Sequence, residues 1–121
     1  MCQRLFPRHA QSFLFELLTD SIDTDRFILE SSQGKIRIKG NNRNSLAAGL
    51  NHYLKNYCHT HVSWYASETV EMPDVLPEIP QPVYIRSKCD NRFFLNYCTF
   101  GYTMPYWKWQ DWERLIDWMA L

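Results

Sequence analysis

The chain has 121 residues, of which 45% are hydrophobic and 21% charged, and its formal net charge is zero. This length predicts about one domain, and the composition supports a hydrophobic core rather than a disordered chain. Neutral charge argues against nucleic acid or an anionic membrane as a partner recruited by bulk charge. No run of residues approaches 18 apolar positions, so we expect no transmembrane span. The N-terminal residues also lack the basic, apolar and small-residue order of a signal peptide.

The first forty residues predict strands. Residues 7–18 are compatible with a helix that turns into a strand or with a helix throughout, and apolar alternation in the second half favours the strand. Residues 26–41 hold two alternating runs around the sequence SSQG, which predicts a β-hairpin. Because Ile36 and Ile38 alternate with basic residues, one face of this hairpin should be exposed to solvent.

An amphipathic helix is predicted next, with its N-cap at Asn44 or Ser45. Apolar residues recur at helical spacing along one face, at Leu46, Leu50, Tyr53, Leu54 and Tyr57. We expect this face to pack against the hairpin as part of the core.

Two short strands, at 61–66 and 83–88, flank a connector in the second half of the chain. Residues 73–82 contain four prolines, which disfavour a helix and predict an extended segment and an internal boundary. Residues 1–88 therefore predict a small α+β domain, an antiparallel-rich sheet with a helix packed on one face. They contain no GxSxG, glycine-rich phosphate loop or HExxH motif.

The four cysteines, at positions 2, 58, 89 and 98, show no CxxC spacing, so neither a structural zinc site nor a disulfide framework is indicated. The cluster of Cys58, His59 and His61 could contribute metal ligands. A helix C-terminus, where histidine interacts favourably with the helix dipole, is the interpretation we favour. We expect no metal and no cofactor.

The last thirty residues differ in character. Residues 92–98 predict a buried strand, residues 99–106 a loop, and the chain from Trp107 a helix. One face of that helix carries a hydrophobic stripe, formed by Trp109, Trp112, Leu115, Ile116 and Met119. Strand, polar loop and amphipathic helix form the repeating unit of a (β/α) barrel, whose functional groups lie at the C-terminal ends of strands. Asn96 and Cys98 occupy that place.

These residues also resemble a known family. The stretch LNYCTFGYTMPYWKWQDWERLIDWMAL is similar to the opening of the catalytic barrel of the α-N-acetylglucosaminidases, glycoside hydrolase family 89. The family motif reads N-x-C-T-x-x-Y, then W-x-W-x-x-W-E-R-x-I-D-W-M-A-L. Upstream, G-N-N and S-x-A-x-G-L-x-x-Y-L-K resemble the family's N-terminal domain. The resemblance implies an N-terminal domain at 1–88 and the first β/α unit of a truncated (β/α)8 barrel at 89–121. We expect the chain to end on an apolar helix because the rest of the barrel is missing.

The resemblance implies a retaining hydrolase acting on glycans with terminal α-linked N-acetylglucosamine. Its acid/base and nucleophile are expected beyond residue 121, so no catalytic residue is assigned here. Glu113 and Asp117 lie on the outer helix and are not candidates. The substrate-binding residues implied are Asn96, Cys98 and, with a less defined role, Tyr102. An asparagine amide can donate to and accept from sugar hydroxyls, and a cysteine is small and a weak donor.

Alternatives remain open for the tail. Most of its tryptophans are expected to pack within the helix layer, and Trp107 is left unassigned. One alternative function is a non-catalytic carbohydrate- or protein-binding module. Another is a structural domain that self-associates through the exposed C-terminal helix, and we expect such association. Family resemblance implies a lysosomal or exported protein.

Overall fold

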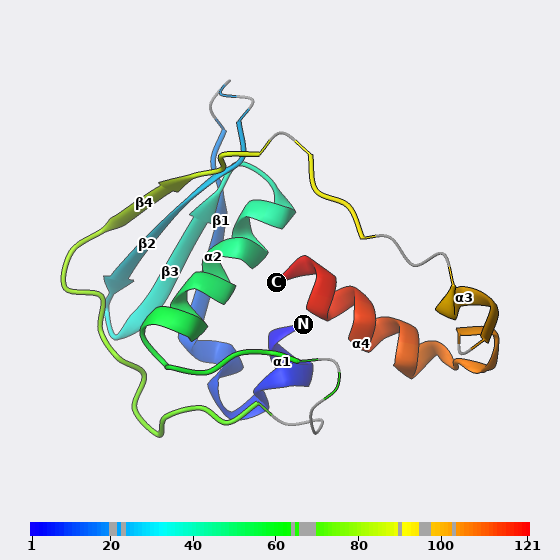
Figure 1. Cartoon of the computed structure of the whole chain (residues 1–121). Coiled ribbons are helices and arrows are strands. Elements are labelled where there is room, and N and C mark those ends of the chain that lie inside the picture. Colours follow the sequence, from blue (N-terminus) through cyan, green and yellow to red (C-terminus); the bar gives the residue numbers. More distant parts are fainter. Residues whose placement is uncertain are drawn as a thin grey trace.

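The structure is a computed structural model that describes every residue except 20, 21, 23, 64, 66–69, 90, 95–97 and 103. A sheet and its covering helix form one part of the molecule, and the C-terminal helix lies beside them (Figure 1). The N-terminal elements are α1 (Cys2–Leu5), the 3-10 helix η1 (Pro7–Ser12), β1 (Phe13–Leu17), β2 (Arg26–Ser32), β3 (Lys35–Gly40), α2 (Arg43–Asn56) and β4 (Val83–Arg86). The C-terminal elements are α3 (Thr99–Tyr102), the 3-10 helix η2 (Met104–Tyr106) and α4 (Trp109–Ala120).

The sheet has the strand order β1-β3-β2-β4. The β2–β3 hairpin and the β2–β4 pair are antiparallel, whereas β1 runs parallel to β3. Helix α2 covers one face of this sheet (Figure 1). The expected small α and β domain is therefore confirmed at this level, including the strand that begins at Phe13 and the hairpin around SSQG.

The hairpin has a two-residue turn, because Ser32 is opposite Lys35. Both turn residues, Gln33 and Gly34, have positive φ angles of 54° and 73°. This combination matches the right-handed twist of the strands, and glycine supplies the second position without steric cost. The turn thus sets the register that directs Ile36 and Ile38 to the core.

The core lies between the sheet and α2. Its completely buried side chains are Leu29, Ile38, Leu50, Tyr53 and Leu54. The helix approaches the sheet closely at Gly49, where an added Cβ would lie 2.7 Å from Cγ2 of Ile38. This contact explains a glycine inside a helix, where it otherwise costs about 1 kcal/mol relative to alanine. The predicted hydrophobic stripe is confirmed as core packing.

The helix N-cap is Asn42, not the predicted Asn44 or Ser45. Its Oδ1 accepts a hydrogen bond of 2.8 Å from the backbone N–H of Ser45. The preceding Asn41 accepts from the backbone N–H of Arg26 at 3.0 Å and from Ser45 Oγ at 2.8 Å. The G-N-N sequence therefore joins the hairpin to the helix. A cap prediction considers hydrogen bonds to the first turn of the helix, and it does not consider the bond by which the Asn41 side chain also reaches Arg26 of the hairpin.

The proline-rich segment is extended as predicted and carries no helix or strand from residue 70 to 82. It is attached to the domain at two points. The Tyr53 hydroxyl donates to the carbonyl of Pro77 at 2.7 Å, and the Ile79 N–H donates to Ser31 Oγ at 2.8 Å. The strand predicted at 61–66 is wrong for residues 61–63 and 65, and its other two positions lie outside the described residues. Among the described helices, none is long and apolar enough to cross a membrane.

Candidate functional site

The residues predicted to contact a sugar belong to the segment around α3. Asn96 lies outside the described residues. Cys98 is exposed and directly precedes α3, and Tyr102, the last residue of α3, is 76% exposed. Helix α3 lies beyond the N-terminal end of α4, away from the sheet (Figure 1). The structure therefore places Cys98 and Tyr102 at the two ends of one short helix on an open surface.

The strand predicted at 92–98 is not present at residues 92–94, and positions 95–97 are outside the described residues. Phe93 is 87% exposed and Phe94 47% exposed, so the prediction of a buried segment is also wrong here. A strand needs a neighbouring backbone to accept and donate its ladder hydrogen bonds. The described part of the sheet ends with β4 and offers no partner to residues 92–94.

Helix α4 begins at Trp109 rather than at the predicted Trp107. The Lys108 backbone N–H donates to the Asp111 carboxylate at 2.9 Å, which satisfies one free amide at the helix N-terminus. Leu115 is buried at 2% exposure, whereas Trp109 is 65% exposed. Ile116 and Met119 are also nearly half exposed. The predicted apolar face is thus only partly covered.

Two carboxylates of α4 form ion pairs with the N-terminus of the chain. Arg4 Nε donates to Asp117 Oδ2 at 2.9 Å, and Arg4 Nη2 donates to Asp117 Oδ1 at 2.7 Å. Arg4 Nη1 also lies 3.3 Å from Glu113 Oε1. The Asp117 side chain is only 9% exposed, and this two-point geometry is the strongest arrangement for arginine and a carboxylate.

Sequence reasoning did not find this ion pair. Its partners are separated by 113 positions, and Arg4 belongs to a four-residue helix that was not predicted. The available signal was a carboxylate inside the apolar run I-D-W-M-A-L, because a charge in such a position usually has a partner.

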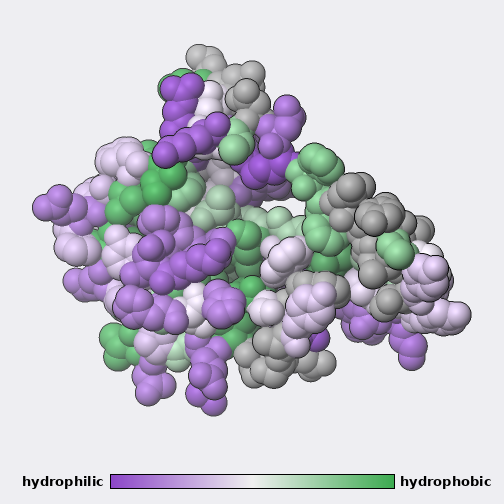
Figure 2. All heavy atoms as spheres, in the orientation of Figure 1, coloured by the Kyte–Doolittle hydropathy of each residue, from purple (hydrophilic) through white to green (hydrophobic). Residues whose placement is uncertain are grey.

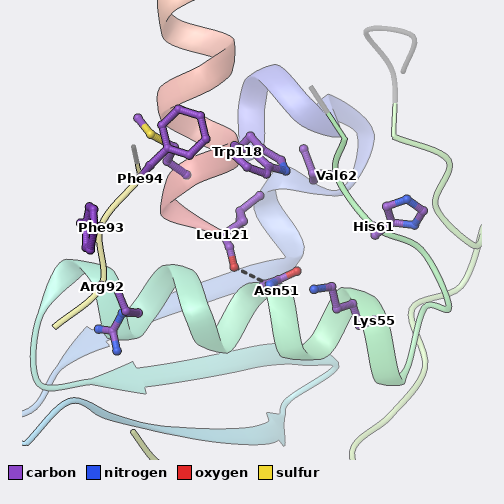
Figure 3. Close-up of a pocket in the computed structure, with 10 residues that line it drawn as sticks. Asn51, Lys55, His61, Val62, Arg92, Phe93, Phe94, Trp118 and Leu121 are labelled. Carbon is purple, nitrogen blue, oxygen red and sulfur yellow. Dashed lines mark hydrogen bonds between the residues drawn. The ribbon is translucent and has the colours of Figure 1, made fainter. Parts of the chain in front are cut away.

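A cavity of about 550 Å³ lies between α2, the segment at 92–94 and the C-terminal end of α4 (Figure 3). The aromatic rings of Phe94 and Trp118 meet edge to face there, with centroids 5.8 Å apart. Lys55 and Arg92 supply positive charge, and no acidic side chain lines the cavity among the described residues. Cys98 and Tyr102 do not line it. At its base the Asn51 amide donates to the Leu121 carbonyl (Figure 3).

Arg92 also enters a polar cluster at the edge of the domain. It contacts the Asp25 carboxylate and donates to Ser87 Oγ at 2.9 Å. Asp25 in turn accepts from the Asn42 side-chain amide at 2.5 Å. The hydrogen bond from Asn42, together with Arg92, holds the pKa of Asp25 below its usual value. One carboxylate therefore connects the hairpin, the helix cap and the start of the tail.

The cluster of Cys58, His59 and His61 follows the end of α2. No group of three or more metal-binding side chains occurs among the residues that the structure describes. Burial raises the pKa of the Cys58 thiol, which makes its thiolate form less available.

Two family models match the chain in sequence. The α-N-acetylglucosaminidase (NAGLU) N-terminal domain matches residues 1–78, and the TIM-barrel domain of the same enzymes matches residues 92–121. Human α-N-acetylglucosaminidase is 38% identical over 87 residues, which are 72% of this chain and 12% of the human protein.

Solved structures of a family 89 glycoside hydrolase from Clostridium perfringens match nearly the whole chain in fold. In complex with PUGNAc, that enzyme matches 98% of this chain with 36% identity and a TM-score of 0.89, and the match spans 14% of its own chain. Its complex with the substrate GlcNAc-alpha-1,4-galactose gives a TM-score of 0.88. The fold and sequence thus define a glycoside hydrolase segment. The chain belongs to the α-N-acetylglucosaminidase family, glycoside hydrolase family 89, and spans about an eighth of these relatives.

Proposed function

We propose that this chain forms the N-terminal domain and the first β/α unit of a retaining glycosidase that removes terminal α-linked N-acetylglucosamine from glycans. The observation that carries the proposal is the order of the two family matches, an N-terminal domain at 1–78 followed by a barrel start at 92–121. In this proposal residues 89–121 become strand and helix when further barrel strands are beside them. A (β/α)8 barrel needs about 250 residues.

We further propose that these 121 residues do not hydrolyse glycosides by themselves. Retaining glycosidases use two carboxyl groups about 5 Å apart, one as acid/base and one as nucleophile. The two carboxylates in the later turns of α4, Glu113 and Asp117, are both paired with Arg4. Both carboxylates are therefore already engaged by an arginine of the N-terminal helix α1, and neither is free to contact a sugar.

The direct test is incubation of the purified chain with an aryl α-N-acetylglucosaminide. We expect no release of the aryl alcohol above the buffer rate. Turnover that follows the protein through purification, and that is lost when the protein is unfolded, would contradict the proposal.

Within the complete enzyme we propose that Asn96, Cys98 and Tyr102 contact the sugar after the first barrel strand. Asn96→Ala should lower kcat/KM about tenfold or more, because a hydrogen-bonding site loses about 1–3 kcal/mol when a partner is left unpaired. Tm should stay within a few degrees. A control change at an exposed position of β4, Tyr84→Phe, should leave kcat/KM unchanged. Unchanged kinetics in Asn96→Ala would remove this residue from the site.

A second candidate function is a non-catalytic carbohydrate-binding module, which the cavity in Figure 3 favours. Its aromatic rings offer stacking surfaces, and its cationic side chains offer donors to sugar hydroxyls. Titration of the chain with N-acetylglucosamine distinguishes the two. Saturable binding that is lost in Trp118→Ala but kept in Trp109→Ala supports the module, whereas absence of binding at millimolar sugar excludes it. The proposed compartment remains lysosomal or exported.

A further inference from the structure

The tail is attached to the N-terminal domain at both of its ends. At its start, Arg92 contacts Asp25 and Ser87. At its end, Asp117 is held by Arg4, and the Leu121 carbonyl accepts from Asn51. Leu121 also packs against the core cluster of the domain.

The middle of the tail is largely open to solvent. Cys98, Tyr102, Tyr106 and Trp109 are all exposed, and Figure 1 shows α3 at the far end of α4 from the sheet. Figure 2 shows hydrophobic residues in several places on this face of the molecule, over the sheet as well as beside the tail, among hydrophilic ones. The tail is therefore folded back on itself, with its two ends together and its middle pointing away.

We propose that the N-terminal domain is a two-point anchor for the first β/α unit, with Asp25 binding the start of the unit and Arg4 binding its last helix. The partner that this surface fits is the segment 92–121 of the same chain. Its chemistry is complementary at each point, a carboxylate on the domain for Arg92 and a guanidinium on the domain for Asp117.

This inference deepens the proposed function, on which it rests, by assigning a position to the domain. In a β/α unit, the N-terminus of the strand and the C-terminus of the helix lie at the same end, and the strand–helix loop lies at the other. The anchor holds the start of the strand and the end of the helix. In this proposal the domain therefore lies at the face of the barrel where the strands begin, opposite the face that carries the active site. The loop containing Cys98 and Tyr102 is left free to face the substrate. The N-terminal domain therefore positions the barrel and does not contribute to the sugar site.

The two anchor points should differ in strength. The Asp117 side chain is 9% exposed and bound at two points, whereas the side chains of Arg92 and Asp25 are 53% and 26% exposed. Hydrogen bonds to buried charges contribute more than exposed ion pairs do. We therefore expect the Arg4–Asp117 pair to stabilise the attachment of the tail more than the Arg92–Asp25 pair does.

The experiment is amide hydrogen exchange on the 121-residue chain, followed separately in α4 and in β3 and α2. Arg4→Met should speed exchange in α4 about tenfold, Arg92→Met about threefold, and neither should change exchange in β3 or α2. Arg8→Met is the matched control, an exposed arginine in η1 four positions from Arg4, and should change neither region.

A double-mutant cycle tests whether Arg4 acts through Asp117. Asp117→Asn combined with Arg4→Met should speed exchange in α4 no more than the larger single effect, because both changes remove one interaction. The anchor is overturned if α4 exchanges at the wild-type rate in Arg4→Met, if the two single effects multiply, or if β3 loses protection to the same extent as α4. These outcomes do not depend on hydrolysis, so failure here leaves the glycosidase assignment standing.

Discussion

Residues 1–88 form a buried core, whereas most of the large apolar side chains described in residues 89–121 are partly or fully exposed. In the first region Leu29, Ile38 and Leu50 are completely buried between a sheet and a helix. In the second region, Phe93 and Trp109 are largely exposed although the tail is richer in aromatic residues. The first region contains both surfaces of its core, a sheet and α2. Among the described residues, α4 contacts the domain at a few points, through Arg4 of α1 and through α2. An apolar composition thus predicts burial only for side chains that face a second apolar surface in the same chain.

The sharpest test of this difference compares one buried and one exposed apolar side chain. Leu50→Ala should lower the free energy of unfolding by about 2–5 kcal/mol, because it removes contacts and leaves a cavity in the core. Ile116→Ala, at 46% exposure in α4, should change it by less than about 0.5 kcal/mol. Urea unfolding followed by far-UV circular dichroism measures both. Equal losses would mean that α4 is part of the same core.

Glycine substitutions give a second comparison of the two regions. Gly49→Ala should destabilise the protein by about 1–3 kcal/mol, because the new Cβ would lie 2.7 Å from Cγ2 of the completely buried Ile38, so that the helix or this side chain has to shift. At Gly101 in α3, a Cβ would meet no atom within 4 Å, so Gly101→Ala should be neutral or slightly stabilising. Thermal melts of both variants report the result. A stable Gly49→Ala protein would show that α2 can shift from the sheet.

The boundary between the regions can be tested by truncation. We predict that a chain ending at Lys88 melts cooperatively, with Tm only a few degrees below that of the full chain. Its described sheet is complete, because β4 pairs with β2 through residues 83–86. A chain ending at Glu78 lacks β4 and should be clearly less stable. Non-cooperative melting of the chain that ends at Lys88 would mean that the domain needs residues 89–121 in order to fold.

The smallest expected effect is self-association through the exposed face of α4. Trp109, Ile116 and Met119 remain at least 45% exposed, and contiguous apolar surface of this kind commonly finds a partner. We predict that the 121-residue chain forms weak oligomers at tens of micromolar in sedimentation velocity. Ile116→Glu should restore a monomer, whereas Gln110→Glu, elsewhere on the same helix, should not. A monomeric wild-type chain would show that the contacts with α1 and α2 suffice.

The N-terminal fold was largely predictable because its signals are local. The alternation at Ile36 and Ile38 and the helical stripe containing Leu50 each depend on a few neighbouring residues, and both predictions are confirmed. The parallel pairing of β1 with β3 was not predicted, because register between distant strands leaves no local pattern. In residues 89–121 the sequence predicted the helix but not the residue at which it begins. The roles of Asn96, Cys98 and Tyr102 stay predictions that depend on family resemblance.

The strand order also has a consequence for how the chain folds. The first strand made, β1, cannot pair until β3 has been made about twenty residues later, and β4 pairs with β2 from more than fifty residues away. The β2–β3 hairpin, with its two-residue turn, is the pairing with the least loop closure, so it should form first and within microseconds. Both edge strands then add to an existing template. During synthesis β1 therefore stays unpaired for an interval in which Phe13, which is buried in the folded protein, is exposed to solvent.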